Sequence, residues 1–199
     1  MSAEGRTSFR ERLRRSLAEP SPEPPLAGPR TAAIALILLE GQDSSEFLLI
    51  ERATREGDPW SGHMALPGGH HDASDADLAV TAERETLEEV GLDLRAHGER
   101  VGRLSDFTPI RGVPVAVRPF VYLLSARPTL VLSAEVRQAL WVPVAPLLAG
   151  AMRATHTFSR GGQSLEFPAW DIDGHLVWGL TYRVVDEFFR RFNLVLAGG

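Results

Sequence analysis

Cysteine is absent from this chain of 199 residues, and no run of about 18 consecutive apolar residues occurs in it. Without thiols the chain cannot form disulfide bonds, use thiolate catalysis or build a zinc site on cysteine. The lack of a long apolar run argues against a membrane-spanning helix, and the N-terminal residues lack the continuous apolar segment of a secretory signal. The expected location is therefore the cytoplasm, without membrane association.

An excess of positive charge is also lacking. The 21 basic residues are outnumbered by 26 acidic ones, which gives a formal net charge of −5. Nucleic-acid binding through phosphates usually needs a basic field, so a nucleic-acid partner is not expected. The length and the apolar content of 44% suffice for one buried core, which favours one domain with an appended arm.

The arm is predicted to contain an amphipathic helix over residues 8–19. Phe9, Leu13 and Leu17 recur at intervals of four, with arginines between them. We expect this apolar stripe to pack on its own domain or on a second subunit, so a homodimer is a candidate assembly. Binding to a membrane or an acidic ligand is the less favoured alternative.

A proline-rich segment, residues 20–29, cannot sustain a helix and is predicted to be an extended linker. The predicted boundaries are residues 1–29 for the arm and linker, and 30–199 for the main domain. Its β-rich runs and helical patterns are mixed along the chain, which favours an α/β sandwich. The predicted strands cover residues 31–40, 46–53, 115–126 and 140–145, and the predicted helices cover 75–90, 144–148 and 179–193.

The helix predicted over residues 75–90 has recognisable ends. Ser74 is the predicted N-cap, with Asp77 as the acid of a capping box and Asp75 in the first turn, where the helix dipole favours negative charge. Gly91 is the predicted glycine that ends the helix.

Three glutamates on this helix have no such explanation. Glu85, Glu88 and Glu89 stand at i, i+3 and i+4, where each like-charge pair costs roughly 0.2–0.5 kcal/mol and the dipole favours cations. A hard cation such as Mg²⁺ prefers carboxylate oxygens, and glycines Gly68 and Gly69 allow the backbone to come close to the same place. A solvated acidic face is the alternative interpretation.

Residues 84–92, "RETLEEVGL", resemble the Nudix box. That pattern is a glycine, five residues, a glutamate, seven residues, then Arg-Glu-aliphatic-any-Glu-Glu-any-Gly-aliphatic, and here it follows Pro-Gly-Gly. Two departures occur. Gly69 and Arg84 are 84 − 69 = 15 positions apart, one more than usual, so the glutamate slot falls at Ala76 between two aspartates. Thr86 also stands where an aliphatic residue is usual.

The lengthened box is similar to that of the Nudix branch of coenzyme A pyrophosphatases, as is the C-terminal stretch "GHLVWGLTYRVVDEFF". That branch has a further signature upstream of Pro-Gly-Gly. Ile50 stands here in its threonine slot, and Gly57 or Asp58 stands in its arginine slot. The positions that do match are Leu48, Leu49, Arg52, Ala53 and Gly62.

The resemblance implies a Nudix-like α/β/α sandwich with a mixed sheet, and hydrolysis of the pyrophosphate bond in a nucleoside diphosphate derivative. Glu85 and Glu89, helped by Glu88, would hold Mg²⁺, with Mn²⁺ as the alternative ion. The ion would neutralise the pyrophosphate and make the attacking water more acidic. Arg84 would orient the glutamates through ion pairs. For the general base we rank Glu85 first and Glu135 second.

Arginines are the expected contacts for phosphate or ribose, because a guanidinium matches phosphate bidentately. The candidates are Arg52, Arg55, Arg103 and Arg111, and the backbone of Gly68 and Gly69 is expected beside them. Trp60, Phe107 and Trp170 are candidates for stacking on adenine, with a place in the core as the alternative.

The expected partner is thus a small nucleotide, with coenzyme A as the leading substrate. ADP-ribose, a nucleotide sugar or a dinucleoside polyphosphate is the alternative substrate. A nucleotide-binding module without catalysis is the alternative of another class. It is disfavoured because the three glutamates of the box, Glu85, Glu88 and Glu89, are all present.

Overall fold

The computed structural model describes residues 9–17, 30–41, 45–57, 60–108, 115–160 and 163–197. The predicted linker, residues 20–29, lies outside the described residues, as do Asp58 and Arg111. The division of the chain into an arm and a main domain therefore stays a prediction.

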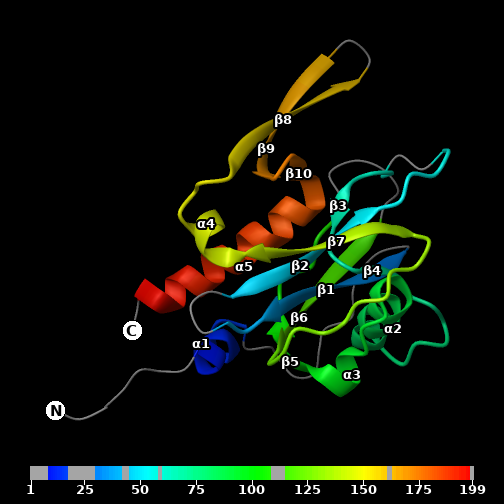
Figure 1. Cartoon of the computed structure of the whole chain (residues 1–199), viewed down its shortest axis with the longest axis vertical. Helices are drawn as coiled ribbons and strands as arrows, with labels where there is room; N and C mark the ends of the chain where they lie inside the picture. The colour runs from blue at the N-terminus through cyan, green and yellow to red at the C-terminus, as the bar shows by residue number, and fades with distance from the viewer. Residues whose placement is uncertain are drawn as a thin grey trace.

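A seven-stranded mixed sheet forms the centre of the molecule (Figure 1). Strands β1 and β6 run parallel in its middle, paired over their whole length, whereas the other pairs are antiparallel. The order is β3-β2-β1-β6-β5, with β4 paired to β1 and β7 paired to β2. The strands are β1 (Thr31–Leu39), β2 (Glu46–Arg52), β3 (Met64–Ala65), β4 (Gly68–His70), β5 (Gly98–Arg103), β6 (Ala116–Leu124) and β7 (Val136–Pro143).

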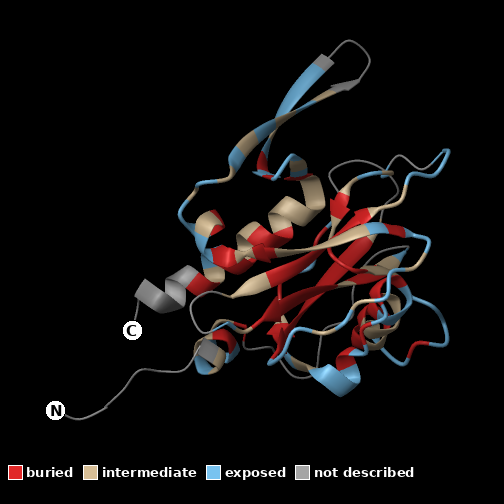
Figure 2. Cartoon of the chain, in the orientation of Figure 1, coloured by how far each residue is buried: buried red, intermediate tan, exposed pale blue. Residues whose placement is uncertain are grey.

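Helices cover both faces of this sheet, which explains why β1 and β6 are apolar on both sides. One apolar cluster joins the sheet to α2 (Leu78–Val90) and α3 (Leu94–His97). The other joins it to α1 (Phe9–Ser16), α4 (Val144–Leu148) and α5 (Gly179–Ala197). The predicted α/β/α sandwich with a mixed sheet is confirmed, and the buried strands lie between the helical layers (Figure 2).

A second sheet was not predicted from the sequence. It contains β8 (Arg153–Arg160), β9 (Gln163–Ile172) and β10 (His175–Trp178), all antiparallel, and the β8–β9 hairpin stands out from the three layers (Figure 1). Among its residues whose burial the structure describes, those near its base, such as Ala169 and Val177, are the buried ones. The hairpin therefore depends on strand pairing more than on burial, because the inward-facing residues of β8, such as His156 and Phe158, are only half-buried.

The amphipathic helix α1 packs on its own domain. Leu13 and Leu17 are completely buried, and Arg10 forms ion pairs with Glu40 at 3.0 Å and Glu99 at 2.8 Å. Gly102, at a bulge in β5, leaves room for this contact, since a Cβ there would lie 2.5 Å from the Leu17 carbonyl oxygen. In the described part of the chain, no helix has the length and apolar character needed to cross a bilayer.

We expect Leu13→Ala to lower the free energy of unfolding by about 2–5 kcal/mol, because it removes a fully buried side chain. The melting temperature should fall by roughly 5–15 °C, and turnover per folded molecule should stay unchanged. Thermal unfolding followed by circular dichroism measures this, with the more exposed Arg14→Ala as the control. An unchanged melting temperature for Leu13→Ala would show that α1 does not pack on the domain in solution.

Candidate active site

Helix α2 begins at Leu78, three residues after the predicted start. Its N-cap is Asp77, whose carboxylate accepts a hydrogen bond from the backbone N–H of Val80 at 2.9 Å. The predicted roles of Ser74 as N-cap and Asp77 as capping-box acid are therefore wrong. The end of the helix is as predicted, with Gly91 at φ 68°.

Asp75, predicted in the first turn, instead lies before the helix and pairs with Arg84. Its side chain is only 3% exposed, and its two oxygens accept from Arg84 Nε at 3.1 Å and Nη2 at 3.0 Å. The Thr81 hydroxyl and the Asp72 backbone N–H donate to the same carboxylate. These hydrogen bonds, Arg84 first, hold the pKa of Asp75 far below its usual value.

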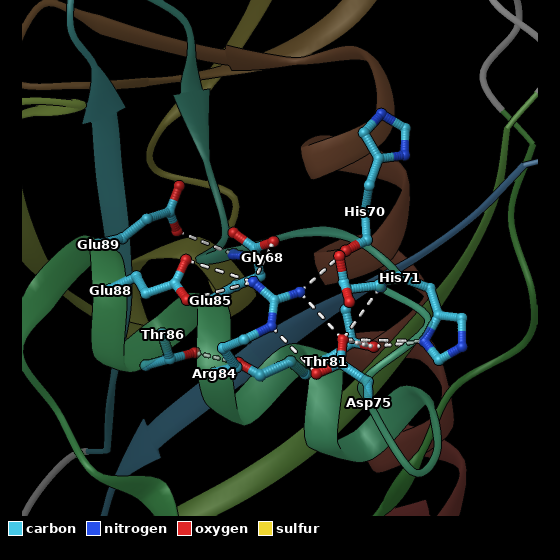
Figure 3. A network of polar contacts seen from close by, with 12 residues as sticks. Gly68, His70, His71, Asp75, Thr81, Arg84, Glu85, Thr86, Glu88 and Glu89 are labelled. Atoms are coloured by element: carbon cyan, nitrogen blue, oxygen red, sulfur yellow. Dashed lines mark hydrogen bonds and ion pairs between the residues drawn. The ribbon is translucent and has the colours of Figure 1, made fainter.

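Arg84 uses its remaining hydrogen-bond donors on the predicted metal ligands and on β4. Its Nη1 lies 2.9 Å from Glu85 Oε1 and 3.3 Å from Glu88 Oε2, and its Nη2 donates to the His70 carbonyl oxygen at 3.0 Å. Figure 3 shows the guanidinium at the centre of this network, with the His70 ring pointing away from it. The geometry agrees with an orienting role for Arg84.

Glu89 is buried against the glycine turn. The residue is 5% exposed, and its Oε2 atom accepts a hydrogen bond from the Gly68 backbone N–H at 2.9 Å. Burial raises the pKa of Glu89 to about 7, and repulsion from Glu85 and Glu135 adds to this effect, against the Gly68 hydrogen bond and the positive charge of Arg52. A carboxylate is thus held where a free negative charge is unfavourable.

Glu85 lies directly over Gly69. A Cβ at Gly69 would lie 2.4 Å from the Glu85 Cδ atom, so any side chain there would displace the Glu85 carboxylate. Gly68 has φ of 145°, and a Cβ there would lie 2.3 Å from the Ala33 carbonyl oxygen. Burial, the largest cause, raises the pKa of Glu85, and Arg84 opposes that shift. The close approach of backbone and glutamates expected from "LPGG" is present.

Glu135 also belongs to this group of carboxylates. It contributes repulsion to both Glu85 and Glu89, and its Oε1 lies 2.9 Å from Arg55 Nη2. The segment before it is attached to the end of α2, because Ser133 N–H donates to the Glu89 carbonyl oxygen at 2.9 Å. The structure therefore brings together Glu85, Glu88, Glu89, Glu135, Arg52, Arg55, Arg84, Gly68 and Gly69.

Arg103 is not part of this group in any described contact. Its Nη1 donates to the Leu104 carbonyl oxygen at 3.2 Å and lies 3.6 Å from Asp106 Oδ1. Of the aromatic candidates, Phe107 and Trp170 are buried, the latter 4% exposed, and belong to the core, whereas Trp60 is 46% exposed. A role of Arg103 in substrate binding stays a prediction.

The carboxylate group suits a divalent cation. Glu85 and Glu89 have raised pKa values, and Arg84 is already engaged by Asp75, so a positive charge bound between them would relieve the repulsion. Within the described residues, no three acidic or histidine side chains already lie together in a metal-binding arrangement, so the glutamates would have to turn toward the ion. A cavity of about 390 Å³ adjoins Glu85 and Glu88 and is also lined by His70, His71, Asp72 and Ser74.

The sequence profile described as "NUDIX domain" matches residues 28–159. The chain belongs to the Nudix family. Mitochondrial coenzyme A diphosphatase NUDT8 of Homo sapiens is 32% identical over 165 residues, covering 81% of this chain and 69% of that protein. Uncharacterized protein C14C4.10c of Schizosaccharomyces pombe is 42% identical over 146 residues, or 62% of this chain and 44% of that protein.

Other Nudix relatives extend over more of the chain. Nudix hydrolase 22, chloroplastic, of Arabidopsis thaliana is 27% identical over 190 residues, covering 89% of this chain and 62% of that protein. The chain thus spans less than two thirds of the length of the fission yeast and Arabidopsis proteins. A MutT/nudix family protein from Enterococcus faecalis has the same fold, with a TM-score of 0.56 at 19% identity, over 87% of this chain and 64% of that one.

Both departures from the Nudix box have structural explanations. Gly69 and Asp75 are 75 − 69 = 6 positions apart, the spacing of glycine and glutamate in the box, so the extra residue lies between Asp75 and Arg84. Asp75 therefore stands at the position of the box glutamate and forms the ion pair with Arg84, whereas Ala76 does not stand at that position. Thr86 stands in the core where an aliphatic residue is usual. Its buried hydroxyl is satisfied there because it donates to the Ala82 carbonyl oxygen at 2.7 Å.

Proposed function

We propose that the protein hydrolyses the pyrophosphate bond of a nucleoside diphosphate derivative with the help of a divalent metal ion, and that coenzyme A is its leading substrate. The observation that carries this proposal is the group of Glu85, Glu89 and Glu135 around the Gly68–Gly69 backbone. Burial and mutual repulsion raise the pKa values of Glu85 and Glu89. Membership of the Nudix family supports hydrolysis as the chemistry.

Glu85 and Glu89, with help from Glu88, would hold Mg²⁺ or Mn²⁺, and the bound ion would supply positive charge to neutralise the pyrophosphate and make the attacking water more acidic. Arg84 holds Glu85 and Glu88 in place while Asp75 holds Arg84. The water oxygen attacks phosphorus, and the bond from that phosphorus to the bridging oxygen breaks.

The proton of the attacking water needs an acceptor. Glu85 is our first choice, because its carboxylate lies against the Gly69 backbone within the group of glutamates, and Glu135 is the second. Arg55 shields Glu135 by its ion pair, and it would have to turn away for Glu135 to act. The same turn would offer the guanidinium to a substrate phosphate.

Coenzyme A carries a 3′-phosphate in addition to its pyrophosphate, so it needs more positive charge than ADP-ribose does. Arg52 and Arg55 supply charge beside Glu89 and Glu135. The name of the human relative and the lengthened box favour coenzyme A. ADP-ribose, nucleotide sugars and dinucleoside polyphosphates are the second choice. They stay candidates because Gly57 or Asp58 stands here in the arginine slot of the coenzyme A branch.

We expect coenzyme A to be cleaved to 3′,5′-ADP and 4′-phosphopantetheine faster than its 3′-dephospho form or ADP-ribose is cleaved. Each compound is assayed with Mg²⁺, with Mn²⁺ and with a chelator, and the products are identified by mass. The chelator should stop all cleavage. If the dephospho form or ADP-ribose is cleaved many-fold faster, coenzyme A is the wrong substrate, whereas the pyrophosphate chemistry stands.

A further inference from the structure

Six aromatic side chains form a cluster that the hydrolytic chemistry does not use. Trp178, at the end of β10, is its centre, and the His156 ring stacks on it with centroids 4.0 Å apart. The His63 ring lies 5.3 Å from Trp178, and Trp60 lies 5.7 Å from His63. Phe158 and Phe167 lie 5.9 and 6.0 Å from Trp178. We call these six residues the aromatic cluster.

The aromatic cluster is not part of either apolar core. All six members keep part of their surface exposed, in contrast to Phe188 in the core, which is 2% exposed. His156 pairs with Phe167 across the hairpin, and Trp178 pairs with Ala169, so these side chains share one face of the second sheet. The β8–β9 hairpin, which carries His156, Phe158 and Phe167, stands out from the helical layers, and its ribbon is tan and pale blue over most of its described length (Figure 2).

One edge of the aromatic cluster is joined through the backbone to Arg52, whose charge acts on one of the proposed catalytic carboxylates. Arg52 N–H donates to the His63 carbonyl oxygen at 3.1 Å, and the charge of Arg52 acts on Glu89. His63 also precedes Gly68 by five residues, which span at most about 17 Å of extended chain. A nucleoside diphosphate derivative can extend over such a span.

The chemistry of the aromatic cluster fits a base and not a phosphate. Its members are two tryptophans, two phenylalanines and two histidines, and none of them carries the fixed positive charge of an arginine. Aromatic rings that keep part of their surface accessible can stack on nucleobases. The arginines that suit the phosphates, Arg52 and Arg55, lie on the side of the carboxylates.

We propose that the aromatic cluster is a stacking site for the nucleobase of the substrate, with Trp60 and Trp178 as its main contacts. This inference rests on the proposed function, since it places the base of the same nucleotide whose pyrophosphate is cleaved. The base then sets the affinity, whereas Glu85 and Glu89 set the rate of cleavage.

The test compares two probes, ADP and inorganic pyrophosphate, bound to the full-length protein with Mg²⁺ and followed by calorimetry. Trp60→Ala and Trp178→Leu should each weaken ADP binding about tenfold and leave pyrophosphate binding unchanged, whereas Trp178→Phe should retain most of the ADP affinity. Leu176→Ala is the matched control, because Leu176 is on the same strand, is 38% exposed and has no ring. It should bind both probes as the wild type does.

Trp60, being 46% exposed, tolerates substitution even if Trp178→Leu does not fold. Unchanged ADP affinity in both Trp60→Ala and Trp178→Leu would overturn the inference, and so would an equal loss of affinity for ADP and for pyrophosphate. A fall of the molecular mass from dimer to monomer with unchanged ADP affinity would also overturn it, and would assign the cluster to a second copy of the chain. Binding needs no turnover, so a failure to hydrolyse any compound would refute the proposed function without deciding this inference.

Discussion

Glu89→Gln should remove pyrophosphate hydrolysis and, in the metal-free protein, raise the melting temperature above pH 7. The loss of activity should be about 100-fold or more, because the change removes a charge that the metal ion needs. Glutamine has the same shape, and its amide oxygen can still accept the hydrogen bond from Gly68. Glu85→Gln should show a similar loss of activity.

The gain in stability follows from the pKa of Glu89, which the fold raises from 4.5 to about 7. A carboxyl group with a raised pKa favours the folded state fully below pH 4.5, and that contribution is lost as the pH rises through 7. The difference corresponds to about 3 kcal/mol in the free energy of unfolding, or roughly 5–10 °C in melting temperature. Thermal unfolding with a chelator should therefore show the two proteins alike near pH 4 and the variant more stable at pH 8.

Glu83→Gln is the matched control on the same helix. Glu83 accepts hydrogen bonds from Tyr122 and Arg95, on another side of α2 from the carboxylate group, so its removal should leave activity nearly unchanged. Added Mg²⁺ should stabilise the wild type and Glu83→Gln but not Glu89→Gln. Near-normal turnover of Glu89→Gln at saturating Mg²⁺ would show that Glu89 is not a metal ligand.

Asp75→Asn should be strongly destabilising and should also lower activity. Asparagine places an N–H₂ group among donors from Arg84, Thr81 and Asp72, and it leaves the buried side of the guanidinium without its carboxylate. Arg84 retains its ion pairs with Glu85 and Glu88 in this variant. We therefore expect the free energy of unfolding to fall by about 2–4 kcal/mol, or the melting temperature by roughly 5–10 °C. Slower turnover would follow from looser positioning of Glu85.

Asp77→Asn is the control for this change, because Asn is as good an N-cap as Asp. It should leave the melting temperature and turnover within error of the wild type. The pKa of Asp75 is lowered from 3.8, so its contribution is present above that pH and lost as the pH falls. The gap between wild type and Asp75→Asn should therefore narrow in acid, and equal effects of the two substitutions would contradict the assigned ion pair.

The sequence predicted the elements with strong periodicity. The runs that became β1, β2, β6 and β7 were found, and the helical pattern of residues 179–193 became α5. Short strands such as β3 and β4 could not be predicted, since they are defined by their pairing to β2 and β1 and not by their own two or three residues. The β8–β9 hairpin was missed because no continuous apolar run marks β8, where polar residues such as His156 and Thr157 separate the apolar ones.

The site shows the same division between local and long-range signals. The glutamates and the glycine turn were predicted correctly as neighbours, because helical spacing and backbone freedom are local properties. The role of Asp75 was not predicted correctly, because its partner Arg84 is nine residues away and capping rules consider only neighbouring residues. The one available signal was the six-position spacing from Gly69.

The attachment of residues 131–135 to the end of α2 links the backbone around Glu89 to the segment that carries Glu135. Val131 and Ser133 donate to the Val90 and Glu89 carbonyl oxygens, so the last turn of the helix cannot open without releasing the segment that carries Glu135. Local opening of this kind would remove Glu89 and Glu135 from the site together. We therefore expect Glu89, a proposed metal ligand, and Glu135, the second candidate for the general base, to leave the site together in any local opening of this segment.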